Sequence, residues 1–359
     1  MKYKLIILLS ILVSSSSYAQ IIDAKHIEKR YKVSESSVVE ISNKYGKVHI
    51  IQWDKDSVEF NIDVKVRGSN EEKVNKLMKT VDFDFTATKY YVIAQTHIKT
   101  GNSGFIGDII NIAESLANSD SYVEINYVVM MPSYIELKID NKYGDVYIGD
   151  QFAPFKLNLS NGNFKGNKLT GDLDVTMKFG DATIREIQKG VINISYGSLE
   201  VDDAHELRVE SKSSKIDIDG VELLRIDSRR DKINLKEVNI IRGTTNFSDI
   251  WIYQLYESTD LNMTYGSVNS DNTSNAFSLI KLVSSYTDVN LFFEAGSSFI
   301  MDLKLRETPV NYPKEMADIM ENMVNKEEKR SIMTGTLGAN PKSQVKIEAE
   351  RGVINLYQR

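Results

Sequence analysis

The stretch Asn141-Lys142-Tyr143-Gly144-Asp145-Val146-Tyr147-Ile148 decides the fold, because close copies of it recur along the chain. Each copy has a polar residue, an aromatic or small residue, a small residue that is often glycine, and then an apolar-x-apolar strand. Further copies begin at Lys178, Ser195, Ser213, Asn246, Thr264 and Ser285. Repetition at a fixed period indicates a repeat architecture before any local element is considered.

The period is measured from the first apolar residue of each copy. The steps between these residues are 18, 18, 17, 17, 17, 17, 18 and 21, counted along Val146, Phe164, Ala182, Leu199, Ile216, Ile233, Ile250, Val268 and Val289. Each period also holds a second alternating segment, such as 155–159 or 207–209, that leads into the next turn. Two strands and two turns in one period predict one coil of a stacked β structure.

The sequence therefore predicts an all-β, single-domain parallel β-solenoid, or β-helix, of about 17–18 residues per coil, with a few short inserted helices. A single coil cannot bury its own apolar face, so stacking would align the first apolar residues in one internal column. Residues two positions later would face the same way, and the intervening residues would face solvent. We expect Gly144, Gly180, Gly197 and Gly266 at corners with positive φ.

The rest of the chain divides around this regular region, which spans 134–300. Residues 1–19 read as a signal peptide and 20–35 as a polar, mobile lead. Residues 36–133 read as N-terminal coils with helical insertions, one starting near Glu71 and one within 101–120. Residues 301–359 read as a helix-containing cap with closing strands at 345–350 and 352–356. The cap helix is expected from Pro313 to Lys329, with Met316, Ile319, Met320 and Met323 on one face.

The compartment follows from the same reading. A basic start, a short apolar run and small residues at 17 and 19 predict export, and the apolar run is too short to span a bilayer. The chain has no cysteine, which excludes disulfides, thiolate chemistry and a lipoprotein anchor. Its charge is −6, with both signs interspersed, which argues against nucleic acid or an anionic membrane as partner. No later stretch is apolar enough to be an integral membrane segment.

We find no catalytic, cofactor or metal signature. The four histidines, His26, His49, His97 and His205, are isolated from one another. Four aspartates recur at one phase of the repeat and have two interpretations. They could form a Ca²⁺ site or a carboxylate pair for polysaccharide cleavage, or they could serve turn formation, which we favour. They are Asp145, Asp181, Asp249 and Asp288.

Aromatic residues also recur at one phase, and they too have two interpretations. The ladder could be a stack that seals the corner, which we favour, or an exposed stripe for sugar rings. Its members are Tyr143, Phe179, Tyr196, Phe247, Tyr265 and Tyr286. Trp251 and Tyr253 lie on an outward-facing strand, and we predict them as the possible surface binding residues.

The Asn-Lys-Tyr-Gly-x-Val-x-Ile phrase at 43–50 and 141–148, the repeats to 293 and the closing strands at 345–356 resemble the bacterial "putative adhesin" family. The resemblance implies a β-solenoid of the cell envelope in an exported protein, with some members acting in envelope stress signalling. It supplies no functional residue. The segments 101–120 and 306–341 depart from the family pattern.

We therefore expect a non-enzymatic, exported cell-envelope β-solenoid that presents an adhesin-like binding surface, in the periplasm or at the cell surface. Its partner would be an envelope protein or a glycan. One alternative is a periplasmic envelope-stress sensor or modulator. A second alternative is a β-helix polysaccharide lyase or hydrolase, which would require clustered Asp, Lys or Arg on adjacent coils.

Overall fold

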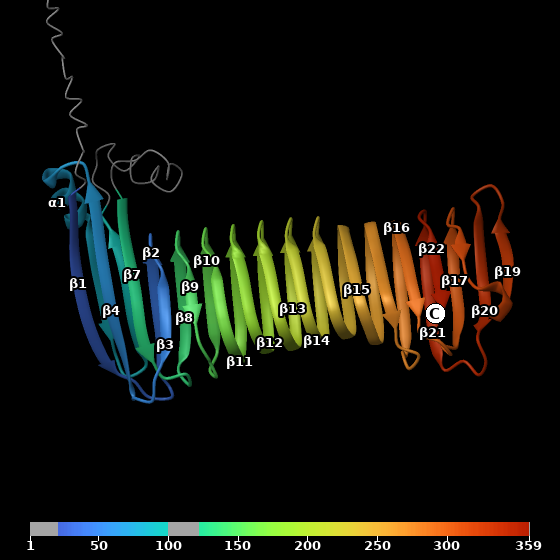
Figure 1. The fold of residues 1–359 in the computed structure, drawn as a ribbon, viewed down its shortest axis with the longest axis horizontal. Helices are drawn as coiled ribbons and strands as arrows, with labels where there is room; N and C mark the ends of the chain where they lie inside the picture. The colour runs from blue at the N-terminus through green and yellow to red at the C-terminus, as the bar shows by residue number, and fades with distance from the viewer. Residues whose placement is uncertain (1–20, 100–121, 359) are drawn as a thin grey trace, which may run out of the picture.

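The structure is a computed structural model that describes residues 21–99 and 122–358, and its strands stand side by side in one long row (Figure 1). The described residues form 22 strands, one α-helix and one 3-10 helix. The predicted all-β class is confirmed. The predicted signal peptide and the predicted helical insertion at 101–120 lie outside the described residues.

The middle of the chain is parallel and in register. Its strands are β8 (Glu136–Lys142), β9 (Val146–Ile148), β10 (Phe155–Ser160), β11 (Phe164–Lys178), β12 (Asp181–Ser195), β13 (Ser198–Lys212), β14 (Lys215–Arg229), β15 (Lys232–Thr273) and β16 (Leu279–Phe293). Leu199 of β13 pairs with Ala182 of β12 on one side and with Ile216 of β14 on the other. These are the pairs that the 17-residue step predicts. We call one such step a coil.

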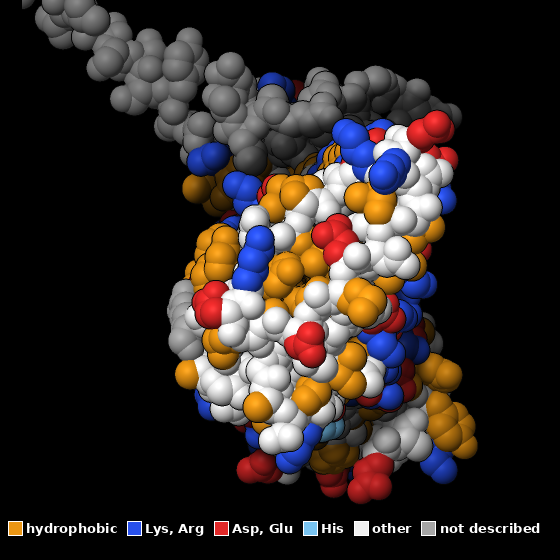
Figure 2. All heavy atoms as spheres, turned by 90° about the vertical axis from the view of Figure 1, so that its right-hand side faces the viewer, with side chains coloured by type: hydrophobic (Ala, Val, Ile, Leu, Met, Phe, Trp, Pro, Cys, Tyr) orange, Lys and Arg blue, Asp and Glu red, His pale blue; other side chains and the backbone are white. Residues whose placement is uncertain are grey.

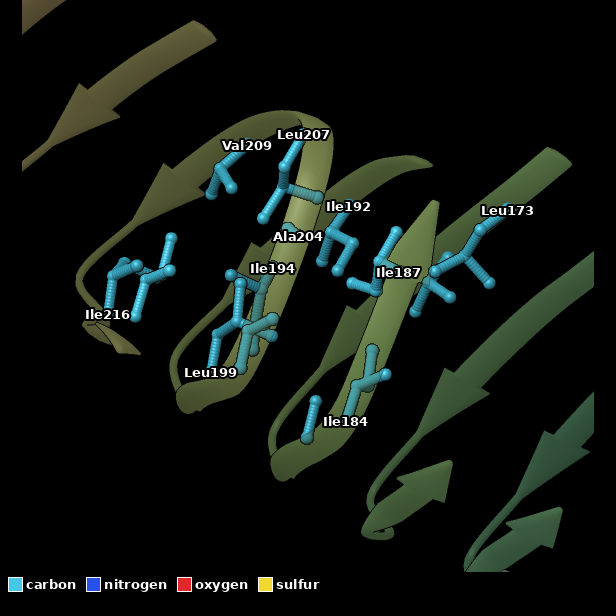
Figure 3. Close-up of a cluster of buried hydrophobic side chains, with 14 of the residues drawn as sticks. Leu173, Ile184, Ile187, Ile192, Ile194, Leu199, Ala204, Leu207, Val209 and Ile216 are labelled. Carbon is cyan, nitrogen blue, oxygen red and sulfur yellow. The ribbon is translucent and has the colours of Figure 1, made fainter. Parts of the chain in front are cut away.

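Side chains from successive coils fill a continuous core. Because side chains alternate along a strand, Leu199 and Val201 face inward while Glu200 faces solvent. Figure 3 shows Ile184, Ile194 and Leu199 beside one another in the core, which Ile192, Ala204, Leu207 and Val209 continue. Fully burying one such aliphatic side chain contributes about 1.5–3 kcal/mol, so the columns supply most of the stabilisation.

The sheet is mixed, because antiparallel pairs occur at both ends of the row. At the N-terminal end β1 (Ile21–Lys32), β4 (Ser57–Gly68) and β7 (Tyr122–Met131) are antiparallel neighbours. So are β5 (Val81–Ala87) and β6 (Tyr91–Ile98), whereas β2 (Val38–Lys44) and β3 (Val48–Gln52) pair in parallel with β8 and β9. A uniformly parallel sheet is therefore not what the chain forms.

Two predictions for the N-terminal end have different outcomes. The helix near Glu71 is confirmed as α1 (Glu71–Thr80), whose N-cap Asn70 accepts a hydrogen bond from Lys73 N and whose Val74 and Leu77 are buried. The prediction of a mobile lead at 20–35 is wrong for Ile21–Lys32. These residues form β1, which pairs along its whole length with β4. The edge of β4 supplies backbone partners that a reading of polarity alone cannot show.

The C-terminal end contains a second correction. Instead of a helix from Pro313 to Lys329, a 3-10 turn (Lys314–Met316) leads into β19 (Ala317–Asn325), which forms an antiparallel hairpin with β20 (Arg330–Leu337). Met320 is 74% exposed, so the apolar residues do not form the buried helix face that their spacing indicated. Figure 2 views this end and shows hydrophobic side chains on its surface.

The closing strands are confirmed as β21 (Ser343–Glu350) and β22 (Ile354–Gln358). They do not end the row. β21 lies between β16 and β17 (Phe299–Arg306), and β22 lies between β16 and β18 (Val310–Asn311). The last two strands of the sequence therefore lie inside the row, before β17 and β18. Each of them has a strand partner on both sides, so neither is an exposed edge strand.

The corners depend on two adjacent residues in different ways. The aromatic or polar residue, not the glycine, takes the left-handed conformation, with φ of 59° at Tyr143, 57° at Phe179 and 60° at Tyr196. Of the four glycines for which positive φ was predicted, only Gly266 has it, with φ 136°. The other corner glycines are needed for space, because a Cβ on Gly180 would lie 1.9 Å from the carbonyl oxygen of Gly162.

Replacing a corner glycine should therefore be costly. We expect Gly180→Ala to lower the free energy of unfolding by about 2–3 kcal/mol, because the coils must move apart to admit the methyl group. Gly220→Ala is the matched control, since its Cβ would meet the Asp203 Oδ1 atom at 3.0 Å and the Asp202 carbonyl oxygen at an ordinary contact distance of 3.6 Å. Urea denaturation of both variants measures the difference, and equal midpoints would contradict this account of the corner.

Glu59 gives a pH-dependent prediction. Its buried carboxylate accepts hydrogen bonds from Asn61 Nδ2 at 3.2 Å and from the Arg30 guanidinium, and these bonds hold the pKa of Glu59 below its usual value. A lowered pKa stabilises the fold above the unfolded-state pKa, and this contribution is lost as the pH falls through the folded-state pKa. Glu59→Gln should therefore be less stable than the wild type at pH 7, and the gap should shrink below about pH 4. Urea midpoints across this range test it, and a constant gap would refute it.

Candidate binding face

The strand on one side of each coil presents a row of outward side chains. Around coils 213–253, inward Ile216, Ile233 and Ile250 alternate with outward residues that lie close together across neighbouring coils. We call these outward residues the binding face: Asp217, Asp219, Asn234, Lys236, Trp251 and Tyr253. Asp217 and Asn234 are register partners on β14 and β15.

Trp251 and Tyr253, which the sequence singled out, are both at the surface. Trp251 is 41% exposed and Tyr253 51% exposed, and their ring centroids are 6.4 Å apart at an interplanar angle of 44°. The Trp251 indole N–H donates to Asp271 Oδ2 at 2.9 Å, which fixes the ring. A large aromatic ring held at the surface by one hydrogen bond is a ready contact for an apolar ligand face.

An open groove of about 650 Å³ lies beside Tyr253. It is lined by polar groups that are already partly paired. Asn234 Nδ2 donates to Asp217 Oδ1 at 2.7 Å, and Lys236 Nζ donates to Asp219 Oδ2 at 2.6 Å. The hydrogen bond to Asp219 raises the pKa of Lys236 above its usual value. The groove therefore combines one aromatic wall with fixed hydrogen-bonding groups, as sites for polar ligands do.

The repeated aspartates serve contacts between coils. Asp181 Oδ1 accepts from Ser198 N at 3.0 Å and from Ser198 Oγ at 2.7 Å, and Asp145 Oδ1 accepts from Asn163 N at 2.8 Å. Asp249 accepts from Ser267 Oγ, and Asp288 accepts from Val353 N. In residues 21–99 and 122–358, no group of three His, Asp or Glu side chains could hold a metal ion.

The aromatic ladder combines features of both interpretations. Phe179 stacks on Tyr196 with centroids 5.1 Å apart, and Phe247 stacks on Tyr265 at 4.7 Å. The rings are nevertheless 38–54% exposed, so they line the corner without sealing it. The stack is interrupted where the left-handed residue is not aromatic, at Asn161, Ser213 and Arg230.

The histidines remain surface residues. His26 lies 2.8 Å from Asp63, His97 lies 3.0 Å from Asp84, and His205 lies 2.7 Å from Glu222. His49 contacts the ring of Tyr147. The structure does not bring any two of them together.

Sequence reasoning missed a buried carboxylate. Asp231 stands where other coils have the corner glycine and is 2% exposed. It accepts hydrogen bonds from Ser211 Oγ, Ser228 Oγ and Ser214 N, each at 2.7 Å. The signal was available, because serine replaces an apolar residue at 211 and 228 in the same phase of the repeat.

Over the part of the chain that the structure describes, no helix is long and apolar enough to cross a membrane. No protein-family model matches this chain, and no curated protein matches it.

The comparison with solved structures returns matches of low sequence identity and low TM-score. A putative adhesin from Parabacteroides merdae ATCC 43184 is 12% identical, with 74% of this chain and 95% of that chain covered and a TM-score of 0.37. A putative adhesin from Parabacteroides distasonis ATCC 8503 is 13% identical, with 75% and 98% covered and a TM-score of 0.33. A putative lipid binding protein from the same strain is 12% identical, with 74% and 96% covered and a TM-score of 0.32. Likeness at this level assigns no function to this chain.

Proposed function

We propose that this chain is an exported, non-enzymatic parallel β-solenoid that binds a glycan of the cell envelope through the binding face. The observation that carries the proposal is the half-exposed ring pair Trp251 and Tyr253, of which Tyr253 lines a groove with fixed carboxylate, amide and ammonium groups. Aromatic rings pack on the apolar faces of sugar rings, while such polar groups hydrogen-bond to hydroxyls.

The parallel register of β14 and β15 supports this proposal, because it determines which residues meet on the face. Trp251, Asn234 and Asp217 are far apart in sequence, and the repeat places them in one outward column. A rigid sheet holds such a constellation more accurately than loops do. A purely structural role would not require two large aromatic rings on this face.

The hydrolase alternative has less support. Glycoside hydrolysis uses two carboxyl groups, one of which must protonate the leaving group. Asp217, Asp219 and Glu237 are the carboxyl groups that line the groove. Asp217 and Asp219 each already accept a hydrogen bond from a lysine, Lys215 and Lys236 respectively. Glu237 is therefore the one groove carboxyl group without a lysine partner among the described residues, and the hydrolase alternative depends on it as the acid. No contact in the structure favours the stress-sensor alternative over a glycan.

The test is binding to an array of envelope glycans. We expect Trp251→Ala and Tyr253→Ala each to weaken binding at least tenfold, equivalent to about 1.4 kcal/mol, because the ring contact is lost. Tyr256→Ala is the matched control, since Tyr256 is as exposed as Trp251 but is neither a groove residue nor part of the Trp251–Tyr253 ring pair.

All three variants should unfold at the wild-type urea concentration. Unchanged glycan binding in the Trp251 and Tyr253 variants would refute the proposed site. Shortening of a bound polysaccharide by the wild-type chain, seen by chromatography, would establish the hydrolase alternative instead.

A further inference from the structure

Several charged side chains pair with an opposite charge on a neighbouring coil. Lys156 Nζ lies 2.9 Å from Asp174 of the next coil, Lys168 lies 2.7 Å from Glu186, and Lys281 lies 3.2 Å from Asp260. Side chains in one outward column are only about 4.8 Å apart, so a mismatch would place like charges in close contact. Opposite charges on adjacent coils are therefore the arrangement that stability favours.

Like charges are also register partners, as Arg208 and Arg225 are, but each of these two arginines has an ion pair with a glutamate. One corner gathers cations that mostly lack such a partner. We call it the basic corner, and it consists of Lys212, Lys215, Arg229, Arg230 and Lys232. Lys212 is the register partner of Arg229, and Lys215 is the register partner of Lys232. Only Lys215 has an ion pair, with Asp217 at 2.7 Å; among the described residues the other four cations have none. All five are exposed except for their contacts with rings, in a chain whose net charge is −6.

The acidic groups nearby do not neutralise the basic corner. Asp231 lies beneath it, but its carboxylate is buried and accepts its hydrogen bonds from serine hydroxyls and from the backbone of Ser214 and Arg229. Asp249 accepts from Ser267 on the following coil. Asp227 is exposed and forms no ion pair within the described ranges. The buried network around Asp231 holds the backbone of the corner in place, so the cations project from a fixed base.

Aromatic rings close both ends of the basic corner. The ladder of stacked rings is interrupted at Ser213 and Arg230, and the rings that border the gap are Tyr196 and Phe247. Lys212 Nζ lies 5.7 Å from the Tyr196 ring centroid, and the Arg230 guanidinium lies 5.9 Å from that of Phe247. These cation–π contacts keep two of the cations at the surface and limit their side-chain freedom.

The basic corner is continuous with the binding face. Lys232 and Asn234 are successive outward residues of one strand, and the Lys215–Asp217 ion pair joins the two surfaces directly. A saccharide chain lying on Trp251 and Tyr253 would therefore reach the free cations within the next sugar unit or two. Guanidinium and ammonium groups bind carboxylate and sulfate oxygens by charge-assisted hydrogen bonds.

We propose that the basic corner selects acidic glycans, binding a carboxylate or sulfate substituent while the sugar rings lie on the binding face. This inference rests on the proposed glycan-binding function and specifies its substrate class. It assigns to Arg229, Arg230 and Lys232 the role of specificity residues.

The experiment compares matched probes at low and high salt. Oligogalacturonate supplies a carboxylate on each sugar, the same oligomer after carboxyl reduction is neutral, and a carrageenan oligosaccharide supplies sulfate without any carboxylate. The variant Arg229→Gln/Arg230→Gln/Lys232→Gln removes three cations that have no ion pair in the described structure. The control Lys142→Gln/Lys165→Gln/Lys178→Gln removes three exposed lysines without ion pairs in the described structure, and thus changes the net charge equally.

We expect the wild type to bind at least one acidic probe at least tenfold more tightly than the neutral one, with an advantage that falls as salt rises. The basic-corner variant should lose this advantage, the control should keep it, and Trp251→Ala should weaken all probes. Whichever acidic probe binds more tightly distinguishes carboxylate from sulfate.

The outcomes separate the two proposals. Equal affinity for acidic and neutral probes, or acidic binding that survives in the basic-corner variant, would overturn this inference and leave the proposed function standing. Acidic binding that needs the basic corner but not Trp251 or Tyr253 would refute the proposed binding face, and of this inference it would leave only the cation contacts. Failure of the wild type to bind any glycan, on the array or in solution, would overturn both.

Discussion

The close approach of one coil to the next at the corner is the constraint on which the structure depends. A Cβ on Gly144, Gly180 or Gly197 would lie within about 2 Å of a carbonyl oxygen on the preceding coil, so these positions must be glycine. The preceding residue then turns the chain in the left-handed conformation, which costs an ordinary residue about 1–2 kcal/mol. Ring stacking between coils and the buried aliphatic columns offset this cost. Where the corner has Ser214, Asp231 or Ser248 instead, a buried side chain hydrogen-bonds inward.

The repeat period was enough to predict the all-β class and the register of the middle coils, because spacing alone determines which inward residues meet. It failed where the chain leaves the repeat. Residues 317–325 fit a helical spacing of apolar residues. They nevertheless form strand β19, because β20 pairs with β17 on one side and offers its other edge to β19. Residues 21–32 look like solvent-exposed chain because their partner, β4, is distant in sequence. The positive φ was predicted for the corner glycine, but most corner glycines are required for space, and the residue before each of them has the positive φ.

The same geometry explains how much of the site was foreseeable. Trp251 and Tyr253 were predicted because alternation showed that both face outward. The groove beside Tyr253 was not, because it depends on the relative heights of side chains on three coils. The basic corner was missed for another reason: Lys212, Arg229 and Lys232 look like ordinary surface charges until the register places them side by side. A regular core thus leaves the outer surface free to vary, and the candidate functions lie in that variation.

The central claim is that outward residues one period apart are adjacent in space, and disulfide trapping tests it most directly. The chain has no cysteine, so an introduced pair is the only one present. Thr183 and Glu200 are register partners, whereas Thr183 and Asp217 are two coils apart. Bridged cysteines need Cα atoms less than about 7 Å apart. We predict rapid oxidation of Thr183→Cys/Glu200→Cys and none of Thr183→Cys/Asp217→Cys within the monomer. Equal oxidation of the two pairs, or oxidation of the second alone, would contradict the account.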